Sequence, residues 1–140
     1  MGSRCPFWDL GTNNIHILYN RTYLSDGKSC TEAVETAIKA GYRLIDTACV
    51  YKNHKEVGAT IKKCIDEGIV KREELFITSK LWCCDWKPEN AEKAILQALE
   101  DLQTPYIDLF LLHMSSFYNL SPEEEKKRQE GYFFEYSVAP

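Results

Sequence analysis

The sequence predicts an α/β fold in which short parallel strands alternate with amphipathic helices. Three apolar runs too short for helices are separated by segments with helical periodicity; the runs cover residues 42–46, 75–79 and 106–113. This order predicts parallel pairing through right-handed crossovers. No glycine-rich phosphate loop follows any of the runs, which disfavours Rossmann and P-loop folds. A doubly wound open sheet and a (β/α) barrel remain as the two architectures.

Three helices are predicted from their start and stop signals. The first covers residues 31–40 and starts from Ser29, which has a glutamate three residues later, the spacing of a capping box. The second starts from Asn53 with the same spacing, and the third starts at Pro88, a residue suited to a first helical turn. Typical stop signals follow the three helices in turn: Gly41, Gly68 and Thr104-Pro105.

Two parts of the chain fit this alternation less well. Residues 7–12 are a weaker candidate for a strand that precedes the others. After residue 113 the pattern stops, apart from a short helix expected over residues 121–130 that is charged on all sides. We therefore predict a domain over residues 1–113 followed by a divergent tail over residues 114–140.

Composition and charge predict one soluble globular domain. The chain has 140 residues, of which 44% are hydrophobic and 27% are charged. Its formal net charge of -4, without a basic cluster, argues against nucleic acid and acidic membranes as partners. Without a bilayer-spanning apolar run or a secretory segment, we expect a cytosolic (cytoplasmic) protein. The six cysteines lack zinc spacing, so we interpret them as free thiols and expect no metal site.

Polar side chains stand at the ends of the three predicted strands. Asp46 ends the first, Lys80 follows the second and His113 ends the third. In parallel α/β folds the carboxyl ends of the strands share one face, where active sites are built. Tyr51, in the loop after Asp46, can reach over the same face. We therefore expect these four side chains to lie close together.

An acid, a base, a phenol and an imidazole at one rim suggest proton transfer. A tyrosine, whose ordinary pKa is about 10, acts as a general acid near neutral pH only when its phenolate is stabilised. The ammonium of Lys80, held by Asp46, provides this stabilisation, and a neutral His113 orients a substrate oxygen. Taken singly, each residue has a structural alternative, such as helix capping, solvation or packing. Their coincidence on successive strand ends favours the functional interpretation.

These residues lie within motifs that resemble the aldo-keto reductase family. Residues 41–48 (GYRLIDTA), with the Val50-Tyr51 pair and then EVG, closely resemble the first signature of that family. Three further blocks agree with it in order and spacing: LGT at residues 10–12, REELFITSKLW at residues 72–82 and YIDLFLLH at residues 106–113. The resemblance covers residues 7–113.

The resemblance implies a fold and a reaction. The family folds as a (β/α)8 TIM barrel and reduces aldehydes and ketones with NADPH, which it binds without a Rossmann motif. This chain is then the N-terminal half of such a barrel, with about four parallel strands and three intervening helices. By the same resemblance Tyr51 is the proton donor, Lys80 and Asp46 tune the pKa of Tyr51, and His113 positions the carbonyl group of a small substrate.

The resemblance also implies binding residues. Thr12, Asn13 and Asp46 fall where the family contacts the nicotinamide end of NADPH. Val50 and Trp82 fall where the family lines its substrate pocket, beside the imidazole that positions the carbonyl. A (β/α)8 barrel takes about 250 residues, and most of the family's NADPH site belongs to the half that this chain lacks.

Three departures from the family pattern stand out. His54 occupies a position where the signature has an acidic or amide residue, a change expected to affect only a helix start. Met114-Ser115 replaces a tryptophan-proline pair, which removes an aromatic wall from the pocket. Asn13 replaces a frequent aromatic residue.

Two functions from different classes are therefore expected. The first is an aldo-keto (carbonyl) reductase that transfers hydride from NADPH to an aldehyde or ketone, with Tyr51 as the proton donor. The second is a catalytically inactive half-barrel, either an interaction module or a non-functional product. Uncovered strand edges in a half-barrel predict self-association or pairing with a complementary half-barrel.

Overall fold

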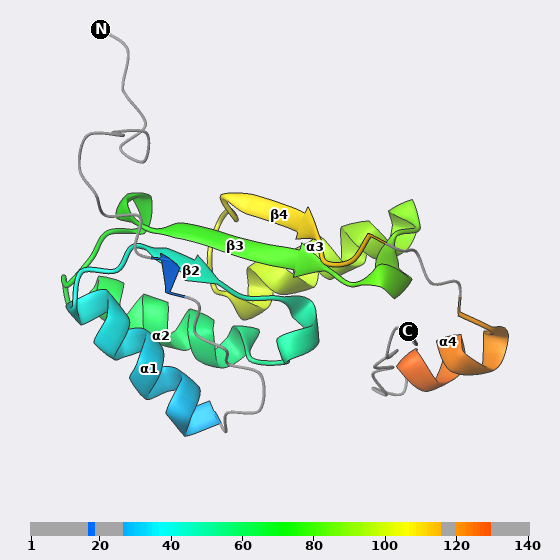
Figure 1. Ribbon diagram of the computed structural model, residues 1–140, viewed down its shortest axis with the longest axis horizontal. Coiled ribbons are helices and arrows are strands. Elements are labelled where there is room, and N and C mark those ends of the chain that lie inside the picture. The colour runs from blue at the N-terminus through cyan, green and yellow to red at the C-terminus, as the bar shows by residue number, and fades with distance from the viewer. Residues whose placement is uncertain (1–16, 19–26, 116–119, 130–140) are drawn as a thin grey trace, which may run out of the picture.

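The computed structural model describes residues 17–18, 27–115 and 120–129. Its strands form one parallel sheet in the order β1 (Ile17–Leu18), β2 (Leu44–Asp46), β3 (Phe76–Leu81) and β4 (Leu109–Leu112) (Figure 1). The last three confirm the three predicted apolar runs. The strand candidate over residues 7–12 lies outside the described residues, and β1 was not predicted.

The helices follow the strands as crossovers. They are α1 (Gly27–Lys39), α2 (His54–Asp66) and α3 (Pro88–Asp101), with the short α4 (Pro122–Gln129) after the sheet. Gly41 and Gly68 have φ of 94° and 70°, the left-handed conformation that ends a helix, as the sequence predicted. The expected cap at Ser29 is wrong, because α1 begins two residues earlier and Ser29 lies within its first turn.

A capping box does form at the start of α4. The Ser121 hydroxyl accepts a hydrogen bond from the Glu124 backbone N–H at 3.3 Å, and the Glu124 carboxylate accepts one from the Ser121 N–H at 2.8 Å. This pairing satisfies two backbone donors at a helix start. It explains how a short helix with charged residues forms where the sequence predicted one.

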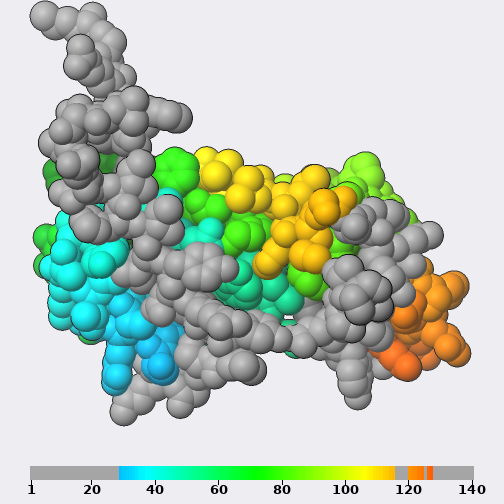
Figure 2. All heavy atoms as spheres, in the orientation of Figure 1, coloured from blue at the N-terminus to red at the C-terminus, as the bar shows by residue number. Residues whose placement is uncertain are grey.

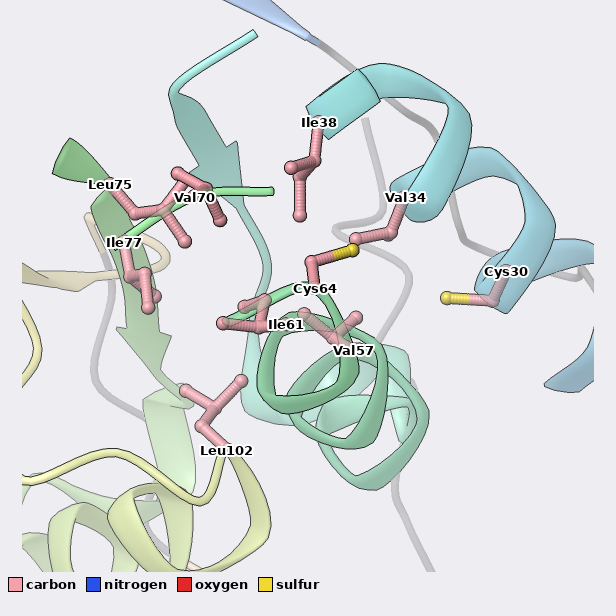
Figure 3. Close-up of a cluster of buried hydrophobic side chains, with 10 residues drawn as sticks. All are labelled: Cys30, Val34, Ile38, Val57, Ile61, Cys64, Val70, Leu75, Ile77 and Leu102. Atoms are coloured by element: carbon pink, nitrogen blue, oxygen red, sulfur yellow. The ribbon is translucent and has the colours of Figure 1, made fainter. Parts of the chain in front are cut away.

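The hydrophobic core lies between the sheet and helices α1 and α2 (Figure 3). Ile38 of α1, Val57 and Ile61 of α2, and Leu75 and Ile77 around β3 are all buried. Each such aliphatic side chain contributes roughly 1.5 to 3 kcal/mol when it is fully buried. The core therefore fixes α2 against β3, which carries Lys80 on its far end.

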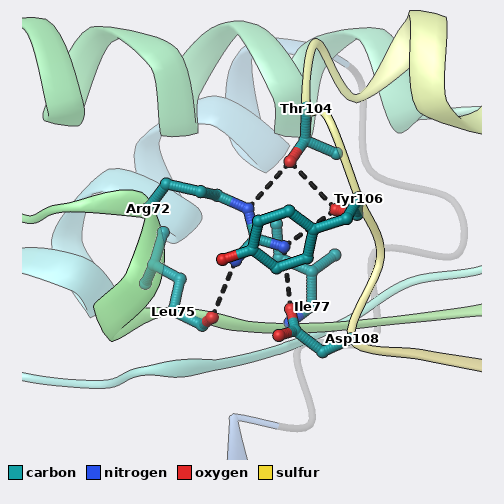
Figure 4. Close-up of polar contacts among 6 residues, drawn as sticks. All are labelled: Arg72, Leu75, Ile77, Thr104, Tyr106 and Asp108. Atoms are coloured by element: carbon teal, nitrogen blue, oxygen red, sulfur yellow. Dashed lines mark hydrogen bonds and ion pairs between the residues drawn. The ribbon is translucent and has the colours of Figure 1, made fainter.

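Arg72 ties the start of β3 to the loop before β4 (Figure 4). Its guanidinium donates to the Thr104 hydroxyl and to the carbonyl oxygens of Leu75 and Tyr106, each at 2.8 Å. It also pairs with the Asp108 carboxylate at 2.8 Å, and that carboxylate accepts the Ile77 backbone N–H at 2.8 Å. A planar, multiply bonded guanidinium is the geometry in which an ion pair adds stability. This network sets the register of β4 against β3 at the end opposite the polar strand ends.

No helix within the described ranges is both long enough and apolar enough to cross a lipid bilayer.

Candidate active site

Asp46 and Lys80 meet at the carboxyl end of the sheet. Asp46 is the last residue of β2, and Lys80 is the penultimate residue of the neighbouring strand β3. The Lys80 ammonium donates to Asp46 Oδ1 and, at 3.0 Å, to the Thr47 carbonyl oxygen. The Lys80 side chain is only 14% exposed, and that of Asp46 is 22% exposed. Lys80 is therefore held in one place by two acceptors in a region where water screens the ion pair weakly.

Tyr51 reaches the same place from the 3-10 helix η2 (Cys49–Tyr51). Its backbone N–H donates to the Ala48 carbonyl oxygen at 3.0 Å, and the next residue, Lys52, turns the chain with φ 55° and ψ 26°. This left-handed residue lets the chain turn sharply from η2 into α2. The Lys80 ammonium nitrogen then lies 5.4 Å from the centroid of the Tyr51 ring, within the range of a cation–π contact.

His113 joins this group from the end of β4. Its backbone N–H donates to the Leu81 carbonyl oxygen at 3.0 Å, which continues the sheet pairing by one residue. Its ring packs edge-to-face against Tyr51, with centroids 5.7 Å apart, and against Trp82, with centroids 5.3 Å apart. Two aromatic neighbours at near-perpendicular angles fix the orientation of the imidazole.

The imidazole of His113 is neutral near pH 7. Burial lowers the pKa of His113 below its ordinary value of 6.5, the Lys80 ammonium lowers it further, and Asp46 opposes this change. Within the described part of the chain, its buried Nδ1 atom has no hydrogen-bond partner. A buried polar atom without a partner costs stability, so the site favours a polar group that comes to it from elsewhere.

The structure therefore brings together five of the predicted site residues: Asp46, Tyr51, Lys80, Trp82 and His113. Val50, expected at the substrate pocket, precedes Tyr51 in η2 and is partly exposed. Thr12 and Asn13, expected at the nicotinamide, lie outside the described residues. The functional roles of all these residues remain predictions.

Sequence reasoning missed a buried polar pair beside this site. His54, the first residue of α2, places its Nε2 atom 3.1 Å from the Ser79 hydroxyl, and both side chains are buried. The expectation that His54 affects only a helix start is therefore wrong, because its ring contacts β3 next to Lys80. The departure of this position from the family signature was the available signal.

We expect His54 to make stability depend on pH. Burial lowers the pKa of His54 from 6.5 to about 4, with a contribution from the Lys80 ammonium, while Asp101 raises it. An unfolded His54 takes up a proton as the pH falls below about 6.5, and the folded one does so only near pH 4. This contribution is therefore complete above pH 6.5 and is lost between pH 6.5 and 4, by roughly 3 kcal/mol.

Urea unfolding of the chain and of His54→Gln at several pH values measures this contribution. The parent should lose stability more steeply than the variant between pH 6.5 and 4, since glutamine does not titrate. Equal slopes for the two chains would contradict the burial of a neutral His54. Lys62→Gln is the control. The exposed ion pair of Lys62 with Asp66 contributes little to stability, so this variant should lose stability with falling pH as steeply as the parent chain.

The cysteines of the described segments are all free thiols. Burial raises the pKa of Cys49 to about 11, and the nearby Asp85 carboxylate adds to this effect. A thiol of this kind is protonated at neutral pH and is a poor nucleophile. Within the same segments no group of three or more histidine, cysteine, aspartate or glutamate side chains is placed to hold a metal ion.

Comparison with known proteins agrees with this geometry. The model of the Aldo/keto reductase family matches residues 10–127. The NAD(P)H-dependent D-xylose reductase of Scheffersomyces stipitis is 54% identical over 101 residues, which are 72% of this chain and 32% of that protein. The chain thus spans about a third of the length of the curated relatives it matches.

Solved structures give the same result. An aldose reductase from Giardia lamblia superposes with a TM-score of 0.68 at 35% identity, over 73% of this chain and 34% of that one. An aldo-keto reductase from Bombyx mori, in complex with NADP, gives a TM-score of 0.65 at 36% identity, over 79% and 41%. The expectation of a partial (β/α)8 barrel is confirmed, and the chain belongs to the aldo/keto reductase family.

Proposed function

We propose that this chain carries the acid–base centre of an NADPH-dependent carbonyl reductase. The observation that supports this most directly is the placement of Tyr51 beside a lysine that is itself fixed by Asp46. The family to which the chain belongs, and its relatives described as NAD(P)H-dependent reductases, agree with this chemistry. The reaction is the reduction of an aldehyde or ketone to an alcohol.

The chemical step divides between two donors. When bound, NADPH supplies the hydride that reduces the carbonyl carbon. Tyr51 gives its phenolic proton to the carbonyl oxygen, so that the C=O double bond becomes a C–H and an O–H bond. The Lys80 ammonium stabilises the phenolate that remains, and Asp46 keeps the ammonium in position. His113, neutral and fixed by two aromatic rings, hydrogen-bonds the carbonyl oxygen and orients it.

The described residues fit one end of the cofactor. Asp46 lies at the carboxyl end of the sheet, where the family resemblance places the nicotinamide, and the buried Nδ1 of His113 lacks a partner within the described segments. Thr12 and Asn13 belong to the same end of the proposed cofactor site. Together these residues would hold the nicotinamide near Tyr51 and leave the rest of NADPH to other contacts.

The substrate class is proposed from the relatives of this chain and from the side chains beside Tyr51 and His113. A xylose reductase and an aldose reductase are among the relatives of this chain, so we propose a small aldose or a comparable aldehyde as the substrate. Trp82, packed on His113, and Val50, next to Tyr51, provide an apolar boundary for such a molecule. In this proposal the carbonyl oxygen of the substrate faces the Tyr51 phenol and the His113 imidazole.

Fluorescence titration of NADPH with the purified chain tests this function, followed by NADPH consumption on addition of D-xylose or a small aldehyde. We expect saturable binding and consumption that depends on the carbonyl compound. Lys80→Met should reduce consumption strongly, since it removes the ammonium beside Tyr51. If the parent chain shows no saturable NADPH binding and no NADPH consumption, the proposal is refuted.

A second candidate function, an interaction module, is supported by the surface of β4. Leu109, Leu111 and Leu112 are all exposed, and β4 pairs with only one neighbour within the described sheet. The yellow atoms of this part of the chain lie on the molecular surface in Figure 2. An apolar strand with an open edge is a template for pairing with another chain. We propose a second copy of this chain as the occupant of that edge.

Sedimentation at micromolar concentration measures this association. The parent chain should sediment as a dimer or larger species, and Leu112→Lys should shift it toward the monomer, because a charge on an edge strand opposes pairing. Leu96→Lys is a matched control, since Leu96 on α3 and Leu112 are both 59% exposed. A parent chain that sediments as a 16.2 kDa monomer would rule out this second candidate.

A further inference from the structure

One side chain of β3, that of Ser79, lies near both ends of the segment that carries Tyr51. Cys49 begins η2, two residues before Tyr51, and the Ser79 hydroxyl is near enough to its thiol to lower the pKa of that thiol, against the larger effect of burial. His54 begins α2, three residues after Tyr51, and its Nε2 atom lies 3.1 Å from the same Ser79 hydroxyl. The Ser79 hydroxyl therefore lies between the two ends of a six-residue segment.

Ser79 also stands directly before Lys80 in β3. Successive side chains of a strand point to opposite faces of the sheet. Ser79 thus meets the helical layer, where its side chain is fully buried, while Lys80 lies on the other face and reaches Asp46 and the Tyr51 ring. The strand β3 therefore positions both members of the proposed acid–base pair. It carries Lys80 itself, and it holds Tyr51 through the segment on which Tyr51 lies.

The hydrogen bonds of this cluster can be satisfied without a charge. The Ser79 hydroxyl has one proton and two lone pairs, and a neutral imidazole has one N–H and one acceptor nitrogen. The charged groups that face the cluster come from both sides. Lys80 and Asp101 act on His54, and Asp85 and Asp101 act on Cys49. Burial keeps the imidazole neutral and the thiol protonated near pH 7, since it lowers the pKa of the first and raises that of the second.

A hydroxyl in contact with an imidazole, with a thiol nearby, also suggests a nucleophile with its base. Ser79 is 0% exposed and His54 is 6% exposed, so no substrate carbonyl can reach the hydroxyl. A nucleophile needs such access. The cluster is therefore suited to holding the chain in place rather than to covalent chemistry.

We propose that the buried hydrogen-bonded pair of Ser79 and His54, together with Cys49 beside it, forms a clamp that sets the position of Tyr51 over Lys80. Ser79 and His54 are positioning residues in this role. The inference rests on the proposed function, because it assigns a purpose to the distance between the phenol and the ammonium. It also gives the unusual histidine at this position a task specific to this chain.

NMR titration of the chain with tyrosines labelled at Cζ tests the clamp. The signal of Tyr51 is identified by its loss in Tyr51→Phe. In the parent chain we expect Tyr51 to lose its proton at a lower pH than the other tyrosines, because the Lys80 ammonium stabilises the phenolate. Loosening the clamp should raise that midpoint by about 1 pH unit, since the ammonium then acts from a greater distance.

The variants separate positioning from stability. His54→Phe keeps an aromatic ring but removes its nitrogens, and Ser79→Ala deletes only the shared hydroxyl, so the second remains informative if the first fails to fold. His54→Gln restores a hydrogen-bonding group near the Nε2 position and should return the midpoint to the parent value. Thr60→Val is the control: it deletes the hydrogen bond of another buried α2 side chain, which Thr60 donates to the Glu56 carbonyl oxygen at 2.7 Å. It should lower Tm without moving the midpoint.

The outcomes distinguish the clamp from the proposed function. If Tyr51 titrates together with the other tyrosines in the parent chain, the proposed function is overturned and the clamp with it. If Tyr51 titrates at a lower pH in the parent but Ser79→Ala leaves its midpoint unchanged, the clamp alone is overturned. A raised midpoint in Ser79→Ala and His54→Phe, restored in His54→Gln and absent in Thr60→Val, supports it.

Discussion

Gly58→Ala is expected to remove a large part of the chain's free energy of unfolding. A Cβ atom on Gly58 would lie 2.5 Å from the Asp101 carbonyl oxygen and 2.6 Å from the Leu102 Cα atom. These are backbone atoms at the end of α3, and Leu102 is itself buried in the core. One of the two helices must therefore move, which we expect to cost about 3 kcal/mol or more out of a total stability of roughly 5 to 15 kcal/mol.

Thermal and urea unfolding, followed by circular dichroism, measure this loss. Elsewhere inside a helix the same substitution stabilises a protein by roughly 0.5 to 1 kcal/mol, so the sign of the effect tests the close approach. Gly68→Ala is the matched control, because a Cβ atom there meets open space and only its φ of 70° opposes the change. A Gly58→Ala chain as stable as the parent would contradict the packing of α2 on α3.

The sequence predicted the elements with strong local signals. The apolar runs at β2, β3 and β4 were recognised because a parallel strand covered on both faces has apolar residues at consecutive positions. The expected burial is wrong for β4, whose three leucines are exposed in the structure. Gly41 and Gly68 marked helix ends because only glycine adopts their positive φ at little cost. The close contact of Gly58 with α3 had no such signal, since it depends on a residue more than forty positions away.

In the candidate site, too, some residues were predicted from local sequence signals and others depend on tertiary packing. Strand-end logic predicted that Asp46, Lys80 and His113 would meet, because parallel strands place their carboxyl ends on one edge. The clamp residues Ser79 and His54 were not found, because a serine in an apolar run and a histidine at a helix start each have ordinary local explanations. Their meeting depends on how α2 packs on β3, which no local pattern encodes.

Tyr51→Phe is expected to lower the rate of carbonyl-dependent NADPH consumption by roughly 10²- to 10⁴-fold, the usual contribution of a general acid. The change removes one oxygen atom and keeps the ring that packs on His113 and lies near the Lys80 ammonium. Stability and NADPH binding should therefore stay close to those of the parent chain. The measurement compares kcat/KM with D-xylose or a small aldehyde for the parent and the variant.

The control for this change is Tyr106→Phe. Tyr106 packs its ring under the Arg72 guanidinium, whose central carbon lies 3.8 Å from the ring centroid, so phenylalanine preserves that contact as well. Both variants lose one phenolic hydroxyl, but Tyr106 lies before β4, at the end of the sheet opposite to Lys80. Turnover should survive in Tyr106→Phe and be lost in Tyr51→Phe. If both variants retain full turnover, a group other than Tyr51 gives its proton to the carbonyl oxygen.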